Sequence, residues 1–399
     1  MGEAPAPGRR ISAFANHREA IFVSRPNRFL IIAQDGEEVF PCHCPNPGRL
    51  LEFCLPGMPL ILEKREASSN AKTQWTVVGI RYSGGVVPLF SARANQAAAE
   101  LVLEHIIPSL GEVRSEYTIG NSRFDFFCRG TGNSKHLVEV KACSLVEYGV
   151  AMFPDAPSGR ASKHLAALAQ LSAEGYIGHI LFVIVHGNPR VFIPNLHTDP
   201  MFSASLSMLG SAPGPGEWIY PPGTVAVHAA LLASDERGSA GLAQAHIPVD
   251  LSQGELAAEN SGSYLMLLEL PEDRDIAVGA LGTRLFRKGW YVYAGSAMKN
   301  LSQRVARHTR KARKLQHWHI DYLTPYSSAR KALPIMSYAN LECALAEDVA
   351  ALGGEAIPGF GSSDCRCASH CFYFSASPLR NPAFVDLLFR YRHRECFVR

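Results

Sequence analysis

The sequence predicts a multi-domain protein: a small β-barrel, then an α/β domain, then a second domain of mixed α/β structure. Three observations support this class. The chain has 399 residues, more than the roughly 100–200 residues of one domain. Residues 21–87 alternate short apolar runs with glycine and proline, whereas residues 92–185 alternate strand-like with helix-like segments. A fresh apolar strand begins at Tyr264, after the polar stretch 252–261.

The composition is that of an ordinary globular protein, with 47% hydrophobic and 19% charged residues. A net charge of +3 does not identify a nucleic-acid-binding protein, because phosphate binding depends on where positive charge clusters. No apolar run is long enough for a secretory signal or a membrane span, so we expect a cytoplasmic protein with no membrane partner. Ten cysteines are too few for a disulfide scaffold and predict thiols in a reducing compartment.

The first domain is predicted over residues 14–90. Its apolar runs at 29–32, 60–62 and 75–80 are short, and turn residues separate them. Closely spaced strands of this kind are typical of a small barrel.

The second domain is predicted over residues 91–251, because strands and helices alternate there. Alanine, leucine and glutamate at helical spacing predict the first helix. The expected elements are helices at 92–107 and 162–174, and strands around Tyr117 and at 124–127, 137–140 and 180–185.

Asp125 lies in one predicted strand, and Glu139 and Lys141 lie in the next, across a glycine-rich turn. If the hairpin is centred on Gly132, paired residue numbers sum to 264, which places Asp125 opposite Glu139 on one face. Lys141 shares that face because side chains alternate along a strand. The pattern therefore predicts two carboxylates and an ammonium group side by side.

Two carboxylates can hold a hard cation such as Mg²⁺ or Mn²⁺, which polarises a phosphate and lowers the pKa of a bound water. Opposed carboxylates destabilise a strand pair, so stability alone does not explain them. A solvated ion cluster across the strands is the alternative interpretation. Glu116 is a further candidate metal ligand, with a plain surface residue as its alternative.

Several segments, in order, resemble the sugar fermentation stimulation protein A family over about residues 14–251. They are His43–Leu50, Ser122–Phe126, Val138–Lys141, Phe153–Ala156 and the residues Arg160, Lys163, His164, Asp199 and Pro200. The resemblance implies an oligonucleotide/oligosaccharide-binding (OB) barrel followed by a PD-(D/E)XK nuclease-like domain that binds DNA. Asp125, Glu139 and Lys141 match the nuclease motif. The implied nucleic-acid-binding residues of this half are Arg28, Asn46, Arg49, Arg160, Lys163 and His164.

The C-terminal domain is predicted over residues 262–399, with 252–261 as the linker. An aromatic strand at 290–296 precedes a predicted helix at 301–316 that carries six cations with no acid between them. Such a helix is a phosphate-binding surface, with a merely solvated basic helix as the alternative. Its predicted nucleic-acid-binding residues are Arg307, Arg310, Lys311, Arg313 and Lys314, in addition to Arg304.

Arg304 and His308 are four residues apart and share a helical face, where a guanidinium can fork a phosphate and an imidazole can pass a proton. Glu342, on a helix that begins near Asn340, is a candidate ligand for one divalent cation, and Tyr264 or Tyr293 would activate or align water. With Tyr264 and Tyr293, these residues resemble the GIY-YIG nuclease superfamily over 262–373. The two tyrosines are separated by more residues than is usual in that superfamily, which predicts an insertion at about 279–288.

Cysteines and histidines cluster near the end of the chain at Cys365, Cys367, His370 and Cys371, with Cys343 beside Glu342. The residue types permit zinc, but Cys-x-Cys is tighter than the usual knuckle spacing. Buried thiols with a hydrogen-bonded histidine are therefore favoured, and a catalytic His370 is a further alternative. His317 and His319 suit core or phosphate-contact roles equally.

The combined prediction is a fused, metal-dependent nuclease that binds DNA and hydrolyses phosphodiesters at one or both sites. The rival is a non-catalytic DNA-binding regulator of sugar-utilisation genes. RNA is also compatible as a substrate, because neither motif recognises the 2′-hydroxyl.

Overall fold

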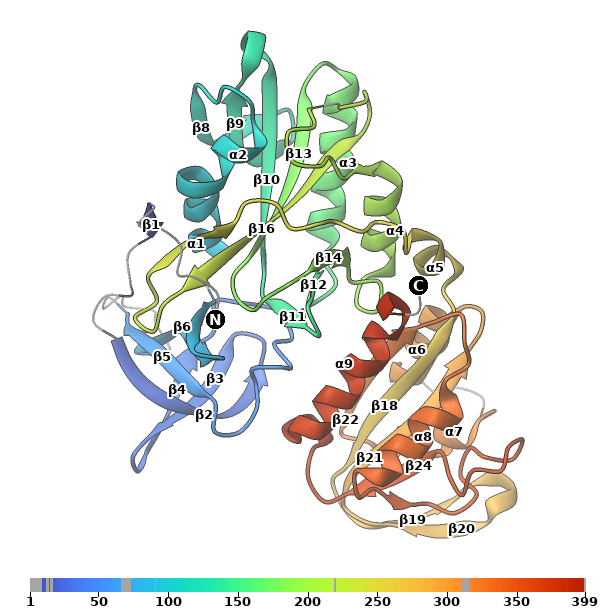
Figure 1. Ribbon diagram of the computed structural model, residues 1–399. Helices are drawn as coiled ribbons and strands as arrows, with labels where there is room; N and C mark the ends of the chain where they lie inside the picture. The colour runs from blue at the N-terminus through green and yellow to red at the C-terminus, as the bar shows by residue number, and fades with distance from the viewer. Residues whose placement is uncertain are drawn as a thin grey trace. The chain divides into compact units, whose positions relative to one another are not determined.

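A computed structural model describes residues 9–11, 14, 17–65, 73–89, 91–218, 220–310 and 316–397. The chain divides into two compact units, Met1–Gly254 and Glu255–Arg399. Among the described residues, no helix is both long and apolar enough to cross a bilayer. The barrel and the middle α/β region thus share unit 1, and the C-terminal region forms unit 2 (Figure 1).

The N-terminal strands close into a barrel. Their order is β4-β3-β2-β5-β6-β7, and a further parallel pairing of β4 with β6 closes the ring. The bounds are β2 His17–Asn27, β3 Leu30–Asp35, β4 Glu38–His43, β5 Pro59–Lys64, β6 Trp75–Tyr82 and β7 Gly85–Pro88. The short apolar runs read from the sequence are confirmed as strands, and five of them make the closed barrel.

A large mixed sheet forms the centre of unit 1, in the order β1-β17-β16-β13-β10-β9-β8, with β15 beside β16. Its central strands β10, β13 and β16 are parallel, and a separate small sheet has the order β11-β12-β14. The bounds of the large sheet are β1 Arg10–Ile11, β8 Val113–Ile119, β9 Ser122–Arg129, β10 Lys135–Cys143, β13 Ile177–Ile184, β15 Gly210–Ser211, β16 Val225–Ser234 and β17 Ala240–Gln244. The small sheet has β11 Leu145–Glu147, β12 Val150–Phe153 and β14 Val191–Pro194.

Helices cover the central sheet. The helix predicted at 92–107 is present, but it contains one π-helical turn, and the helix predicted at 162–174 begins at Gly159 because Ser158 caps it. Ser158 Oγ accepts a hydrogen bond from the Ala161 N–H at 3.2 Å. The helical segments are α1 Ser91–Ala97, η1 Ala98–Val102, α2 Leu103–Ile106, α3 Gly159–Ala173 and α4 Pro200–Leu209.

Strand β13 is buried on both faces, as its unbroken apolar run indicates. Leu181 and Val183 pack into one core with residues of the barrel and of η1, whereas Ile180 and Phe182 pack into a second core with α3 and α4. Barrel and central sheet therefore share a continuous apolar core. This core explains why the two predicted domains 14–90 and 91–251 form one compact unit.

Three buried histidines form a chain across the central sheet. His136 Nδ1 lies 2.9 Å from His179 Nε2, and His179 Nδ1 lies 3.1 Å from His228 Nε2. Ser134 Oγ lies 2.8 Å from His136 Nε2 and ends the chain. Burial lowers the pKa of His136 to about 4 and that of His228 to about 3, and it places the pKa of His179 well below its usual value.

The histidine chain predicts a pH-dependent stability. Because the folded pKa values lie below the unfolded value of about 6.5, the unfolded state binds more protons, so stability falls as pH drops from about 6.5 toward 4. Each buried histidine contributes up to roughly 1.4 kcal/mol per pH unit. Urea unfolding at pH 7.5 and 5.0 measures this slope, which His179→Gln should reduce and the control His105→Gln, at an exposed position, should not. Equal slopes in the wild type and His179→Gln would contradict the assignment.

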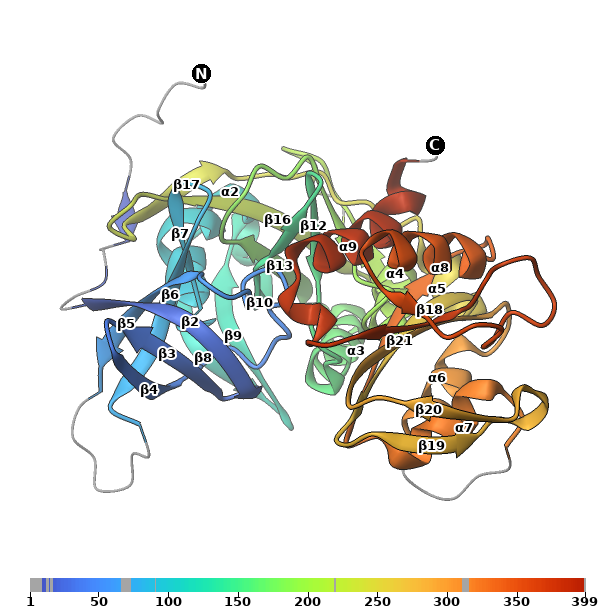
Figure 2. The same cartoon turned by 90° about the horizontal axis from the view of Figure 1, so that it is seen from below.

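Unit 2 has an antiparallel sheet in the order β22-β18-β21-β24-β23. Figure 2 shows α8 and α9 on one face of this sheet and α6 and α7 on the other. A small hairpin of β19 and β20 interrupts the path from β18 to β21 and accounts for the long spacing between the tyrosines. The bounds are β18 Gly262–Leu270, β19 Arg274–Ala277, β20 Thr283–Phe286, β21 Gly289–Ala297, α6 Leu301–Thr309, α7 His319–Leu323, β22 Ala329–Met336, α8 Glu342–Ala351, β23 Glu355–Ala356, β24 Cys371–Phe374 and α9 Pro382–Phe397.

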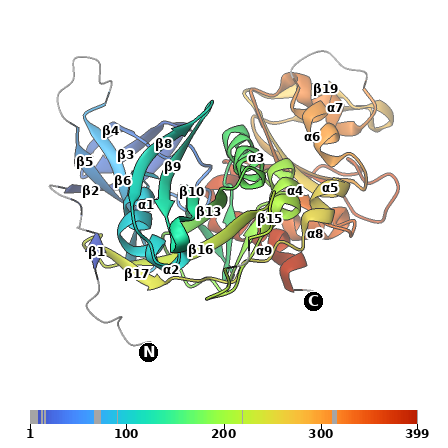
Figure 3. The same ribbon diagram turned by 90° about the horizontal axis from the view of Figure 1, so that it is seen from above.

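The division between the two units falls after Gly254, within the predicted linker 252–261. This linker contains helix α5, Gly254–Glu259 (Figure 3), whose Leu256 and Ala257 are buried. The predicted helix 301–316 is too long: α6 ends at Thr309, and Arg310 is already extended. Lys311, Arg313 and Lys314 lie outside the described residues.

Candidate functional site

Asp125, Glu139 and Lys141 lie together at the edge of a cavity of about 440 Å³ in unit 1. The hairpin register is the predicted one: β9 and β10 pair from Arg129 with Lys135 to Phe126 with Val138, and each pair sums to 264. Val138 and Val140 point into the core, as expected, so Glu139 and Lys141 share the opposite face. The local pattern therefore predicted the register of this hairpin correctly, although the ladder ends at Phe126 and Val138, one pair before Asp125 and Glu139. The role of the three residues as a site stays a prediction.

Glu139 is the most constrained acid of the site, with only 2% of its surface exposed. Its Oε1 forms ion pairs with Lys141 Nζ and with His164 Nδ1, the latter at 2.5 Å. Its Oε2 is buried and has no hydrogen-bond partner within the described ranges. A buried carboxylate oxygen without a donor is costly, and a ligand at Oε2 would offset this cost.

Asp125 is held by two donors rather than by Glu139 directly. Asn95 Nδ2 donates to Oδ1 at 2.7 Å, and the Val140 N–H donates to Oδ2 at 2.7 Å. Asn95 lies on α1, so helix, hairpin and strand together fix the carboxylate. Asn95 was not among the predicted site residues, because one asparagine in an alanine-rich helix carries no local signal.

Glu116 is not part of this site. The β8–β9 ladder pairs Ser115 with Phe126 and Tyr117 with Phe124, and between these pairs Glu116 has a left-handed φ of 53°. Its exposed side chain forms an ion pair with Arg123 at 3.0 Å. The surface interpretation of Glu116 therefore fits the structure, and its role as a metal ligand does not.

The cavity also collects cationic and polar residues from the barrel and from α3. Among the predicted nucleic-acid-binding residues, Arg28, Asn46 and Arg160 line it. Lys163 is exposed on α3 and does not line it. Arg49 also lies outside the lining, and burial lowers the pKa of its guanidinium. His164 contacts Glu139, so its place is within the acidic site.

The loop that carries Asn46 is braced by two residues that the sequence reading did not select as site residues. Arg25 donates to the carbonyl oxygens of Asn46 and Gly48, at 2.8 and 2.6 Å. Asp155, which lines the cavity, accepts from the Leu50 N–H at 2.7 Å. Barrel and α/β region are thus joined at the cavity by directed hydrogen bonds.

A second group of predicted residues meets at the end of β21 in unit 2. The rings of Tyr264 and Tyr293 lie 6.4 Å apart between centroids, on paired strands. Glu342 Oε2 accepts from the Ser296 hydroxyl, and Arg304 Nη1 donates to the Ser296 carbonyl oxygen at 3.1 Å. Burial raises the pKa of both tyrosines and so favours their neutral phenols. Their role in activating or aligning water stays a prediction.

Arg307 of the predicted basic surface and the predicted catalytic residue His308 both lie against an acid from another element of unit 2. Arg307 Nη1 contacts both carboxylate oxygens of Asp321, at 3.0 and 2.9 Å, and buried His308 lies 3.3 Å from the same acid. Asp321 lies on α7, so the helical pattern of α6 did not reveal it. His308 is therefore buried beside this acid, and its predicted proton-transfer role stays a prediction. Of the residues of the predicted basic surface that the structure describes, only Arg310 is exposed, and it directly follows the end of α6.

Gly295 is required by the close approach of Tyr264. A Cβ at position 295 would meet the Tyr264 ring carbon Cζ and hydroxyl at 2.5 Å. We expect Gly295→Ala to displace this ring and lower the unfolding free energy by about 1–3 kcal/mol. Urea unfolding measures the change. The control Gly159→Ala alters a glycine of ordinary φ with no atom within 4 Å of such a Cβ, and it should not lower the unfolding free energy. An unchanged unfolding free energy for Gly295→Ala would contradict the packing.

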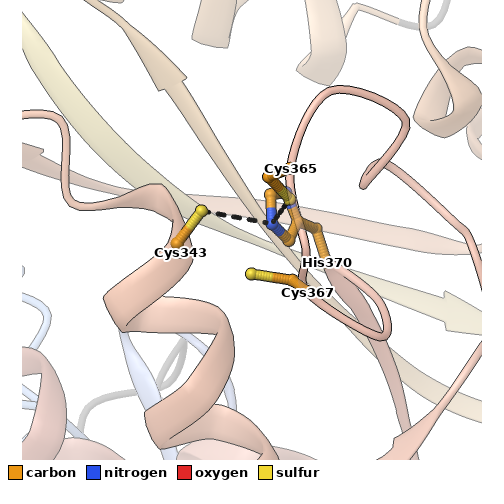
Figure 4. A group of neighbouring side chains, drawn as sticks. All are labelled: Cys343, Cys365, Cys367 and His370. Atoms are coloured by element: carbon orange, nitrogen blue, oxygen red, sulfur yellow. Dashed lines mark hydrogen bonds between the residues drawn. The ribbon is translucent and has the colours of Figure 1, made fainter.

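The cysteines near the C-terminus differ from the favoured prediction of buried thiols. Cys343, Cys365, Cys367 and His370 bring ligand atoms within 4.8 Å of one another, and their three thiols are exposed or half-buried (Figure 4). Cys371 is fully buried in β24 and does not belong to this group. His319 Nδ1 accepts from the Gly361 N–H at 2.8 Å and so braces the neighbouring loop.

Three family models match consecutive parts of the chain. Residues 23–89 match the SfsA N-terminal OB domain, residues 92–212 match the sugar fermentation stimulation protein RE domain, and residues 263–389 match domain of unknown function DUF123. A sugar fermentation stimulation protein homolog of Desulfitobacterium hafniense is 37% identical over 194 residues, covering 48% of this chain and 84% of the relative. The homolog of Methanothermobacter thermautotrophicus is 36% identical over 189 residues, covering 46% and 78%.

A solved structure of Pyrococcus furiosus SfsA in complex with Ca²⁺ matches with a TM-score of 0.51 and 22% identity, over 61% of this chain and all of that one. Fold and cavity thus define a protein with an OB barrel joined to an α/β unit. The chain belongs to the sugar fermentation stimulation protein family, here fused to a DUF123 domain, which is GIY-YIG-like.

Proposed function

We propose that this protein is a metal-dependent nuclease that hydrolyses phosphodiester bonds in DNA at the cavity of Asp125 and Glu139. The observation that carries the proposal is Glu139 Oε2, which is buried with no donor in the described parts of the chain and lies beside a second, firmly held carboxylate. An acid retained for stability alone would satisfy both oxygens. A divalent cation is the ligand that two such carboxylates suit best.

The donor set fits Mg²⁺ or Mn²⁺, because both are hard cations that take oxygen ligands. Asp125 and Glu139 would hold the ion, and when bound it would supply Lewis-acid polarisation of a phosphate and a water of lowered pKa. The D…ExK pattern of the PD-(D/E)XK nucleases supports this assignment. The Pyrococcus furiosus relative was solved in complex with Ca²⁺, another hard cation.

The remaining residues of the cavity have complementary roles. Lys141 and His164 both pair with Glu139 Oε1 and hold this carboxylate in place, and Lys141 also offsets negative charge near the phosphate. Arg28 and Arg160 line the same cavity, where a guanidinium can fork phosphate oxygens. The barrel contributes Arg28 and Asn46, so it would guide the strand toward the acids.

Unit 2 contains a second candidate site. It lies at the end of β21, where four residues predicted from the resemblance to the GIY-YIG superfamily come together: Tyr264, Tyr293, Arg304 and Glu342. The specific observation is that Ser296 joins Arg304 to Glu342. Arg304 also lies over the Trp318 ring at 4.5 Å, which holds its guanidinium in position. There a single cation on Glu342 and a phosphate on Arg304 would support cleavage.

The test incubates the full chain with single- and double-stranded DNA and RNA, with Mg²⁺, Mn²⁺ or a chelator. Cleavage that requires the metal and is lost in Glu139→Ala, but kept in Glu342→Ala, supports the cavity of unit 1. The reverse assigns hydrolysis to unit 2. Binding without cleavage under every condition overturns the nuclease proposal and favours a DNA-binding regulator.

A further inference from the structure

We infer that Cys343, Cys365, Cys367 and His370 form a structural zinc site in unit 2 (Figure 4). Their ligand atoms lie within 4.8 Å of one another, although Cys343 is separated from Cys365 by 22 positions in the sequence. Three thiolates and one imidazole are a common donor set of structural zinc. This inference does not depend on either candidate nuclease site.

The distances between the donors fit a tetrahedral ion. Zn–S bonds of about 2.3 Å and Zn–N bonds of about 2.0 Å place the donors of a tetrahedron roughly 3.5–3.8 Å apart. His370 Nε2 lies 3.3 Å from Cys365 Sγ and 3.8 Å from Cys343 Sγ. An ion at the centre therefore requires only small movements of side chains. Soft thiolates exclude Mg²⁺, Ca²⁺ and Mn²⁺ as the preferred occupant.

The elements that carry the four residues explain what the ion would stabilise. Cys343 is the second residue of α8, where the positive end of the helix dipole favours a thiolate. Cys365, Cys367 and His370 lie in the segment between β23 and β24, which has no regular secondary structure over 357–370. Loops of this length are uncommon unless something organises them. Zinc would tie this loop to α8.

The second nitrogen of His370 links the zinc site to Glu342. Nδ1 lies 2.9 Å from Glu342 Oε1, while Nε2 faces the thiols. A histidine ligand of zinc commonly donates its other N–H to a carboxylate, which sets its tautomer and ring orientation. With zinc on Nε2, the proton of His370 stays on Nδ1 and is donated to Glu342. The ion would thus hold both the ligand histidine and the neighbouring carboxylate.

The test measures metal in the full chain, purified under reducing conditions without chelator. We expect about one zinc per chain. On exchange with Co²⁺, we expect the intense ligand-field bands of a tetrahedral site and thiolate-to-cobalt charge transfer. A wild-type protein that retains no zinc, and that shows only octahedral cobalt bands, overturns the inference.

Variants locate the site. Cys365→Ser should weaken Co²⁺ binding at least about 10-fold and reduce the charge-transfer absorption, because a thiolate is lost. Cys371→Ala is the matched control, since this thiol lies in the same segment but outside the cluster. Equal loss of metal in both variants, with both chains folded by circular dichroism, would overturn the assignment. None of these measurements uses nucleic acid, so failure of the nuclease proposal and failure of the zinc site are distinguishable.

Discussion

Replacing Glu139 with glutamine is expected to weaken Mn²⁺ binding by at least about 100-fold and to abolish metal-dependent cleavage. The substitution keeps the shape of the side chain but removes the charge of the buried carboxylate, whose Oε2 is free for a cation. A neutral amide is a poor ligand for a hard cation beside only one remaining acid, Asp125. Isothermal titration calorimetry measures the affinity, and cleavage of labelled DNA measures the activity.

Glu116→Gln is the matched control for Glu139→Gln. Glu116 is also an acid of this sheet, but it is exposed and paired with Arg123. We expect its substitution to leave both Mn²⁺ affinity and cleavage unchanged. If Glu139→Gln binds Mn²⁺ as tightly as the wild type, the buried oxygen has another function and the proposed metal site is wrong.

Replacing Asp321 with alanine is expected to lower the unfolding free energy of unit 2 by about 3–5 kcal/mol. The carboxylate is fully buried and pairs with both Arg307 and His308. It also accepts from the backbone N–H groups of His317 and Trp318, at 3.0 and 3.1 Å. Its removal leaves the Arg307 guanidinium, the His308 imidazole and two backbone N–H groups without this acceptor. Urea unfolding, followed by tryptophan fluorescence, measures the loss.

The pH dependence of this network has a definite sign. Burial raises the pKa of Asp321, but the hydrogen bonds from His308, from the two backbone N–H groups and from Arg307 outweigh it, so the folded pKa lies below the usual 3.8. The stabilisation is therefore complete above about pH 3.8 and is lost as the pH falls below it. Asp321→Ala should remove this acid-dependent part of the stability.

The control for Asp321→Ala is Asp386→Ala. Asp386 forms an exposed i,i+4 pair with Arg390 on α9, at 3.3 Å. Exposed pairs of this kind contribute about 0.3–0.5 kcal/mol. If Asp321→Ala and Asp386→Ala lowered the unfolding free energy by similar amounts, the large contribution expected of the Asp321 hydrogen bonds and ion pairs would be wrong.

Residues that act within one hairpin were predictable. The turn at Gly132 sets the register, and alternation along β10 then places Glu139 and Lys141 on one face. These relations depend only on the period of a strand and on the length of a turn. The barrel strands and the antiparallel start of unit 2 were predictable for the same reason, because glycine and apolar residues mark them locally.

Residues that act across elements were not predictable from local pattern. Asn95 reaches Asp125 from a helix 30 positions earlier, and Asp321 neutralises Arg307 from a different helix. Likewise, Cys343 joins the Cys365 group, and Cys371, which follows His370 directly, is excluded because it points into the core. No spacing rule connects such positions.

Period, turn chemistry and residue type alone established a barrel, two α/β regions and an acid pair beside a lysine, because each of these follows from interactions among neighbours along the chain. Three-dimensional packing decided the rest. It merged the barrel and the central sheet around one apolar core, and it paired Arg307 of the basic segment with a buried acid from another helix. It also left one oxygen of Glu139 buried with no donor among the residues that the structure describes. A side chain's burial and its ion pairs depend on its neighbours in space, and those neighbours come from distant parts of the chain.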